Sequence, residues 1–393
     1  MCFNCCSSSN LHNFYKQKKC KICYEYGKKI YKEIIKKVKD GKARKNMDVF
    51  IKYCCLFCSN YLHCCTPAFF SYKEGIRWDI ANVLQQVFKF AVPCFFMMSG
   101  ANLLDYYKRY STKEFYKKRL LKVAVPFIVW SIIWYVYSII KVGFKTGEYN
   151  FSIINFVHLF MNNKINNVYW FFYSIIGIYL LTPVIKEITK NRKVTKWFLI
   201  LSFIYLTINP ILENSGIGNY FQLPIINKYL FYYILGYYIK DISLINRTTI
   251  VTKDAKSEKI KNTKILLIVA VGVISLIALI LLNYLNLYYE NKVLNILMKT
   301  ELFGILYYFM IYILFSQIQI TNEKVSRILK DISTLSLGVY LIHQPILNMA
   351  ISIFKLDIYS KVLYFIVPVL LYIFCALVTK IIKKIPYIRV IMP

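Results

Sequence analysis

The sequence predicts an all-α membrane protein, a polytopic bundle of about ten transmembrane helices. The chain of 393 residues is 58% hydrophobic and 17% aromatic, which is more apolar than a typical soluble protein. Its apolar residues form continuous uncharged runs, such as 271–285 and 362–378. With their flanks, such runs are long enough to cross a hydrocarbon core of about 30 Å as helices. Because the runs do not alternate with polar residues, they exclude a transmembrane barrel.

Ten spans account for the apolar runs in order. The first and the sixth are the weakest, and the first contains Lys52, Ser59, Asn60 and His63, so it would fail a strict hydropathy window. The expected spans are 49–66, 80–104, 121–142, 168–187, 197–213, 228–240, 265–284, 302–317, 333–354 and 361–380.

The distribution of positive charge predicts how these spans are oriented. With the N-terminus in the cytoplasm, the loops and tail that fall inside carry about 26 Lys and Arg, against about 8 in the outside loops. This asymmetry predicts a multi-pass protein of the cell membrane with both termini in the cytoplasm. It also gives the net charge of +32 a role in orientation, and no nucleic-acid-binding motif is present.

Three regions follow from these assignments. Residues 1–47 form a basic, cysteine-containing cytoplasmic tail with no cleavable signal peptide, because no apolar segment occurs there. Residues 48–385 form the membrane domain, and 386–393 form a second cytoplasmic tail. Within the membrane domain, the outside loop 143–167 contains an amphipathic stretch, 151–163, that is expected to lie at the membrane interface.

Two histidines stand out because ionisable groups inside a membrane are costly and often functional. His63 lies near the outer end of the first span, and His343 lies near the middle of the ninth. A neutral imidazole offers a proton acceptor with a pKa of about 6.5, which suits a general base. The alternative for each histidine is a structural hydrogen bond to a neighbouring helix.

Charged residues at the span ends are a second set of candidates. Arg119 and Lys122 lie three residues apart, on one face of a helix at the cytoplasmic mouth of the third span, and Lys118 is adjacent. They either orient the helix or bind the phosphates of a cytoplasmic ligand. Asp79 opens the second span on the outer side, where it either binds a hydroxyl or imidazole or caps the helix.

Four sequence blocks carry a resemblance to a known family. In order they are RWDIANVLQQVFKFAVPCFFMMSG (77–100), FYKKRLLKVAVPFIVWSI (115–132), YWFFYSIIGIYLLTPVI (169–185) and SLGVYLIHQPI (336–346). They resemble the integral-membrane acyltransferase family 3, in particular the branch that O-acetylates surface polysaccharides such as the enterobacterial common antigen. The resemblance covers roughly 48–385 and is thinnest between 197 and 330.

The resemblance implies a function and several roles. Family members take an acetyl group from cytoplasmic acetyl-CoA and transfer it to a sugar hydroxyl at the outer face. The histidine that ends the first helix is the general base of the family, which corresponds to His63. The basic pair entering the third helix corresponds to Arg119 and Lys122. We expect Tyr169 and Trp170, with Asp79 and His343, to shape the acceptor site.

One departure from the family keeps other readings open. The family has an arginine eleven residues before the first-helix histidine, where this chain has Lys52. Lysine keeps the charge but lacks the bidentate fork, so Lys52 is an imperfect substitute at the donor or the oxyanion. A catalytically inactive relative is therefore one alternative. Another is a carrier or flippase for a lipid-linked sugar or a small anion, although no internal repeat is visible.

The 12 cysteines concentrate near the N-terminus. Cys2, Cys5, Cys20 and Cys23 form two CxxC pairs at nearly the interval of a zinc ribbon, but the tail lacks the glycines and apolar residues of such a fold. We expect no metal and no bound cofactor, with acetyl-CoA acting as a substrate. The cysteines of the first span are expected to act as small apolar side chains.

Overall fold

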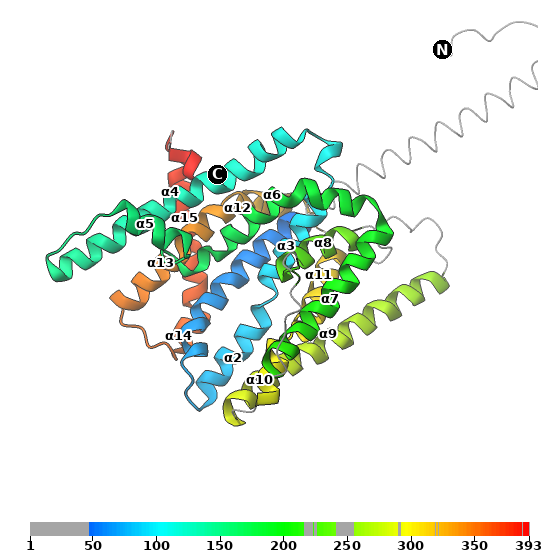
Figure 1. Cartoon of the computed structure of the whole chain (residues 1–393). Coiled ribbons are helices and arrows are strands. Elements are labelled where there is room, and N and C mark those ends of the chain that lie inside the picture. Colours follow the sequence, from blue (N-terminus) through cyan, green and yellow to red (C-terminus); the bar gives the residue numbers. More distant parts are fainter. Residues whose placement is uncertain are drawn as a thin grey trace, which may run out of the picture.

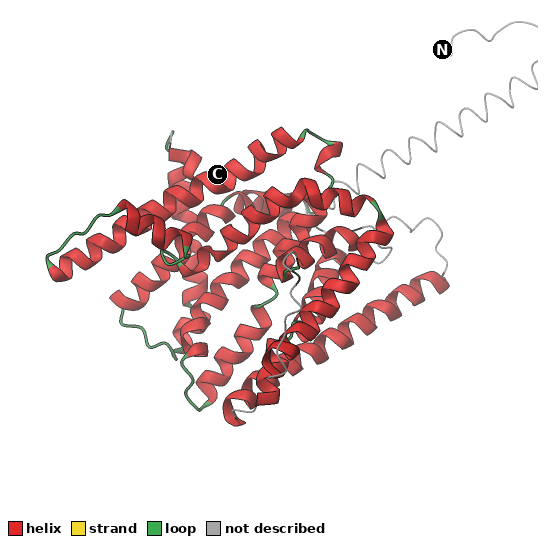
Figure 2. Ribbon diagram, viewed as in Figure 1, coloured by secondary structure: helices red, strands yellow, loops and turns green. Residues whose placement is uncertain are grey.

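Every regular element in the described part of the chain is helical (Figures 1 and 2). The computed structural model describes residues 47–215, 223, 226–240, 255–289, 292–318, 320, 322–386 and 388–392. The expected all-α membrane bundle is confirmed. The four cysteines of the two N-terminal CxxC pairs lie outside the described residues.

The helices follow one another with short connections. The first covers 47–70. The others are α2 (Ile76–Phe88), α3 (Ala91–Leu103), α4 (Thr112–Thr146), α5 (Ile153–Met161), α6 (Trp170–Lys190), α7 (Arg192–Ser215), α8 (Lys228–Ile239), α9 (Ala255–Tyr289), α10 (Lys292–Lys299), α11 (Leu302–Gln317), α12 (Glu323–Thr334), α13 (Ser336–Ile353), α14 (Lys361–Phe365) and α15 (Val367–Lys384).

Seven stretches in the described ranges are long and apolar enough to cross a membrane. They coincide with the expected second to fifth and seventh to ninth spans. Helix 47–70 is too polar for this criterion, as the sequence indicates. Helix α8 has 12 residues, about 18 Å of helix, which is shorter than the hydrocarbon core. The tenth span is interrupted at Ile366, between α14 and α15. The total of ten spans therefore stays a prediction.

Two expected spans differ from the structure in detail. The second is two helices, α2 and α3, separated at Lys89 and Phe90. Pro93 explains the interruption, because proline has no N–H to donate to the carbonyl of residue 89. The third span is longer than expected: Ser111 caps the start of α4 by accepting from the backbone N–H of Glu114 at 3.3 Å. Gly147, at φ 79°, ends it in the left-handed conformation.

Glycines allow the central helices to pack backbone against backbone. A Cβ atom added to Gly100 in α3 would lie 1.7 Å from the carbonyl oxygen of Tyr233 in α8. A Cβ atom added to Gly236 in α8 would lie 2.0 Å from the carbonyl oxygen of Met97. Small residues at such crossings are the usual means of close helix association in lipid. Lipid tails are themselves apolar, so apolar side chains gain little free energy by moving from lipid into a helix contact.

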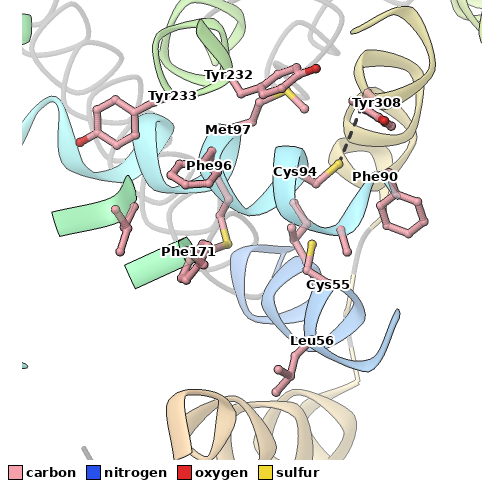
Figure 3. Packing of buried hydrophobic residues seen from close by; sticks show 14 of the residues in the cluster. Cys55, Leu56, Phe90, Cys94, Phe96, Met97, Phe171, Tyr232, Tyr233 and Tyr308 are labelled. Atoms are coloured by element: carbon pink, nitrogen blue, oxygen red, sulfur yellow. Dashed lines mark hydrogen bonds between the residues drawn. The ribbon is translucent and has the colours of Figure 1, made fainter. Parts of the chain in front are cut away.

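Aromatic side chains fill the space around this crossing (Figure 3). Phe96 of α3 stacks on Tyr229 of α8 with ring centroids 5.0 Å apart, and meets Phe171 of α6 at 5.4 Å. Cys94 donates its thiol to the carbonyl oxygen of Tyr308 in α11 at 3.8 Å. The helix 47–70 packs on the same core, where Cys55 is buried, so the expectation that its cysteines pack as small apolar groups agrees with their burial there.

Apolar residues also cover much of the outside of the bundle. On α9, Leu266, Leu267 and Ile274 are each more than 60% exposed. Contiguous apolar surface of this kind is expected of helices that face lipid. The expected amphipathic stretch 151–163 contains α5, whose Ile153 and Ile154 are also exposed. The short helix is thus confirmed, and its place at the membrane interface stays a prediction.

Candidate active site

The helix 47–70 carries two of the candidate residues, Lys52 and His63, at its two ends. Eleven residues separate them, which is about 16 Å along a helix. Lys52 Nζ donates to the carbonyl oxygen of Ser333, at the end of α12, at 2.8 Å. His63 faces His343 in α13, with ring centroids 5.0 Å apart. The helix 47–70 therefore runs parallel to α13, and the site has a lysine end and a histidine end.

The lysine end gathers four cations from three helices, and we call it the basic cluster: Lys52, Arg119, Lys122 and Lys383. Arg119 and Lys383 lie close enough to repel the Lys52 ammonium, and Lys122 repels Lys383 in the same way. Lys383 Nζ donates to the carbonyl oxygen of Thr334 at 3.0 Å. Among the described residues, none of the four forms an ion pair with a carboxylate. The cluster is therefore a local excess of positive charge, as an anion site requires.

The neighbouring Lys118 differs from these four. Its ammonium pairs with Glu114 at 2.6 Å, one turn earlier in α4, and lies over the ring of Tyr110 at 4.7 Å from its centroid. Its charge is therefore already balanced, and the structure separates it from the unpaired Arg119 and Lys122 with which the sequence grouped it.

The histidine end lies inside the bundle, and neither histidine forms an ion pair with a carboxylate of the described residues. His343 is completely buried, and its Nδ1 lies 2.8 Å from the carbonyl oxygen of Tyr340. A carbonyl only accepts, so Nδ1 carries the proton of the neutral ring and Nε2 carries a lone pair. Nε2 is buried without a hydrogen-bond partner among the described residues. His63 is only partly buried, so it is the more accessible histidine of the pair.

A proline fixes the helix that carries His343. Pro345 cannot donate to the carbonyl of Leu341 four residues earlier. Tyr169 supplies its hydroxyl to this carbonyl at 2.8 Å, and Trp134 of α4 supplies its indole N–H at 3.2 Å. Replacement donors of this kind are what make a proline tolerable in a membrane helix.

The remaining predicted acceptor residues are spread more widely. Tyr169 is only 1% exposed and is engaged with α13, so it forms the wall of the histidine end. Trp170 is partly exposed and stacks on Tyr229, with ring centroids 5.1 Å apart. Asp79 lies in the first turn of α2, where a negative charge favours the helix N-terminus. Among the described residues, Asp79 makes no hydrogen bond or ion pair with either histidine.

Several polar residues inside the bundle escaped the sequence-based selection. Lys89 lies between α2 and α3, near the middle of the expected second span, with Glu301 and Lys228 as its charged neighbours. The side-chain amides of Asn60 and Gln86 are buried and have no partner among the described residues. Lys89 could have been selected from the sequence, because it is a charged residue inside an apolar run. Nothing in the sequence distinguished Lys383 from other tail lysines.

A metal centre is not evident in the described part of the chain, where no three His, Cys, Asp or Glu side chains gather to hold an ion. The paired CxxC cysteines of the tail are beyond that part.

Comparison with known proteins gives one result. Residues 49–382 match the family model described as an acyltransferase domain, which is most of the chain. No curated protein and no solved structure shows significant similarity to the chain.

Proposed function

Because this chain belongs to the acyltransferase family whose model spans residues 49–382, we propose that it transfers an acetyl group from acetyl-CoA, or another acyl group from the corresponding acyl-CoA, to a hydroxyl of a cell-surface or lipid-linked polysaccharide. Membership of the family and the membrane-spanning helices support acyl transfer by a membrane protein. The observation that supports the finer proposal is the helix 47–70, with unpaired cations at one end and facing histidines at the other.

The basic cluster binds the donor. Acetyl-CoA carries its negative charge on phosphates, far from the thioester, and a local excess of cations without carboxylate partners suits that group. Arg119 offers a planar fork for phosphate oxygens, while Lys122 and Lys383 act as point charges. Lys52 belongs to this end too. At about 16 Å from His63 along the helix, it acts on the donor rather than on the oxyanion.

The histidine end carries out the chemistry. His63 accepts the proton of the acceptor hydroxyl as that oxygen attacks the thioester carbonyl. The new C–O bond forms, the C–S bond breaks, and the proton passes from His63 to the departing CoA thiolate. Holding donor and acceptor on two sides of one imidazole makes the attack effectively unimolecular.

The acceptor enters at the histidine end, on the side opposite the donor. Trp170, next to Tyr169 in the chain, offers a partly exposed aromatic surface to the acceptor, and Asp79 in the first turn of α2 offers a carboxylate to sugar hydroxyls. Tyr169 contributes by holding α13. With the basic end in the cytoplasm, as the charge distribution predicts, the acceptor site faces the outside of the cell membrane.

The proposal is tested by supplying acetyl-labelled acetyl-CoA to membranes that contain the wild-type chain or its His63→Ala variant. We expect label in the glycan fraction with the wild type, and a loss of about 10²–10⁴-fold with the variant, the usual contribution of a general base. His158→Ala is the matched control, because His158 is an exposed histidine on α5. It should retain wild-type transfer.

Each of the other outcomes has a definite meaning. Equal label with wild type and His63→Ala removes His63 from the mechanism. No label with any glycan fraction, from a wild-type protein that is folded and inserted, contradicts acyl transfer. That result favours a carrier of lipid-linked sugars or an inactive relative, which the lysine at position 52 leaves as the competing reading.

A further inference from the structure

The Nε2 atom of His343 is a buried hydrogen-bond acceptor without a partner among the described residues. The side chain is 0% exposed, and its Nδ1–H is committed to the carbonyl oxygen of Tyr340 at 2.8 Å. The tautomer is thereby fixed, and the Nε2 lone pair points away from that bond into the protein, without a described partner. Leaving a buried acceptor unsatisfied costs about 1–3 kcal/mol, so a position of this kind calls for an explanation.

The ring that faces this acceptor is that of His63. The two ring centroids lie 5.0 Å apart with 48° between the planes, close enough for the ring edges to meet. The ring of Tyr340 also contacts His343, at 5.3 Å between centroids. His63 is partly exposed and His343 is not, so a substrate hydroxyl reaches His63 first and His343 stands behind it.

The support for His343 is rigid. Pro345 frees the carbonyl of Leu341, and Tyr169 and Trp134 both donate to that carbonyl from other helices. Two cross-helix bonds thus hold α13 within one turn of His343. These bonds satisfy the carbonyl that Pro345 leaves free, and the rigidity that they give α13 suits a group that orients another side chain.

We propose that His343 is a positioning residue for His63. A turn of the adjacent His63 ring brings its N–H to the free Nε2 of His343, and this bond selects the His63 tautomer whose other nitrogen has a lone pair for the acceptor hydroxyl. When that hydroxyl gives its proton to His63, the resulting imidazolium keeps its N–H bond to His343 until the proton leaves on the CoA thiolate. The order carbonyl, His343, His63, hydroxyl reproduces the orienting logic of a catalytic triad with a backbone carbonyl in place of the carboxylate. This inference rests on the proposed function of His63.

The experiment measures kcat and the KM for acetyl-CoA in purified protein, with His343→Leu, His343→Gln, His63→Ala and the double variant His63→Ala/His343→Leu. We expect His343→Leu to lower kcat by about 10- to 100-fold with KM unchanged, because it acts on orientation and not on donor binding. Gln offers a carbonyl oxygen as a substitute acceptor, so it should recover part of that loss. The double variant should be no slower than His63→Ala alone, since His343 acts only through His63.

Leu347→Ala is the matched control. Leu347 lies one turn after His343 on the same face of α13 and is also fully buried. A general packing defect in α13 should appear with this variant as well, and it should add to the effect of His63→Ala. If His343→Leu does not accumulate as folded protein, His343→Met takes its place with the same criteria.

The outcomes separate this inference from the proposed function. If the wild type is inactive or His63→Ala is fully active, the proposed function fails. If His63→Ala is inactive while His343→Leu retains wild-type kcat, only the inference is overturned. It is also overturned if the double variant is slower than His63→Ala by the full factor of His343→Leu, or if Gln is no better than Leu.

Discussion

At the Lys52 end of the helix 47–70 the site consists of cations that face backbone oxygens or solvent, whereas at the His63 end it consists of two neutral rings inside the bundle. Lys52 and Lys383 donate to the carbonyls that end α12, and Arg119 is exposed. His343 is completely buried and bonded to its own helix. The helix 47–70 thus connects a cluster of cations, which attracts anions over several ångströms, to a pair of imidazoles, which interact only with atoms in direct contact.

This difference has a physical origin. Coulombic attraction extends over about a Debye length of 8–10 Å, so a cluster of flexible cations binds phosphates without exact placement. Proton transfer needs heavy atoms within about 3 Å, so its groups must be held by rigid neighbours. The histidine end has such neighbours, because Tyr169 and Trp134 donate to the Leu341 carbonyl that Pro345 leaves free. The two ends should therefore respond differently to the same kind of perturbation.

The largest expected difference comes from removing one charge at the basic cluster. Arg119→Gln should raise the KM for acetyl-CoA by about 10- to 100-fold, the effect of losing hydrogen bonds to a charged group, with little change in kcat. Steady-state kinetics at varied acetyl-CoA measures both. Lys117→Gln is the control, because Lys117 is exposed two residues earlier on α4 and faces another direction. An unchanged KM for Arg119→Gln, or an equal rise for Lys117→Gln, would show that the donor binds elsewhere.

Ionic strength should affect the two ends differently in the wild-type protein, with a smaller change in KM than Arg119→Gln causes. Raising NaCl from about 20 to about 300 mM screens the unpaired cations, so the KM for acetyl-CoA should rise several-fold. The kcat should hold steady, because the general base is a neutral imidazole in the proposed mechanism and needs no ionic attraction to the acceptor hydroxyl. Applying the same salt series to Arg119→Gln provides an internal check, since that variant should show a shallower dependence. A fall in kcat with a constant KM would reverse the roles of the two ends.

Two residues of the basic cluster could be identified from the sequence alone. Charges near the ends of apolar runs are visible in any hydropathy plot, and they led to Arg119 and Lys122. The convergence of Lys383 from a distant helix is a property of tertiary packing, so periodicity does not reveal it. The reverse holds for Lys118, which looked equivalent to its neighbours until the structure paired it with Glu114.

The histidine end shows what the sequence contained and what it did not. His63 and His343 were each identifiable as costly intramembrane groups, and their pairing emerges only when the helix 47–70 and α13 lie side by side. The helical class was predictable because lipid leaves a chain few choices. The short α8 was predictable as well, since the expected sixth span, 228–240, nearly coincides with it. The break at Lys89 was not, because a local proline effect interrupts a span without changing its average hydropathy.

The smallest expected effect concerns the bonds that hold α13. Tyr169→Phe removes one donor to the carbonyl of Leu341, but Trp134 still donates to it. The cost should be about 0.6 kcal/mol, seen as a slight fall in the thermal midpoint in detergent and a threefold or smaller fall in kcat. The KM for acetyl-CoA should not change, because the basic cluster does not depend on this bond. Trp134→Phe alone should behave in the same way.

Combining the two substitutions gives the decisive measurement. Tyr169→Phe/Trp134→Phe leaves the Leu341 carbonyl with neither donor, so the loss of stability and of kcat should exceed the sum of the single effects. The excess should appear in kcat alone, since a loosened α13 misplaces His343 and leaves the donor end intact. Additive losses would mean that the carbonyl finds another donor. A rise in KM instead would mean that the two ends of the helix 47–70 are mechanically coupled rather than independent.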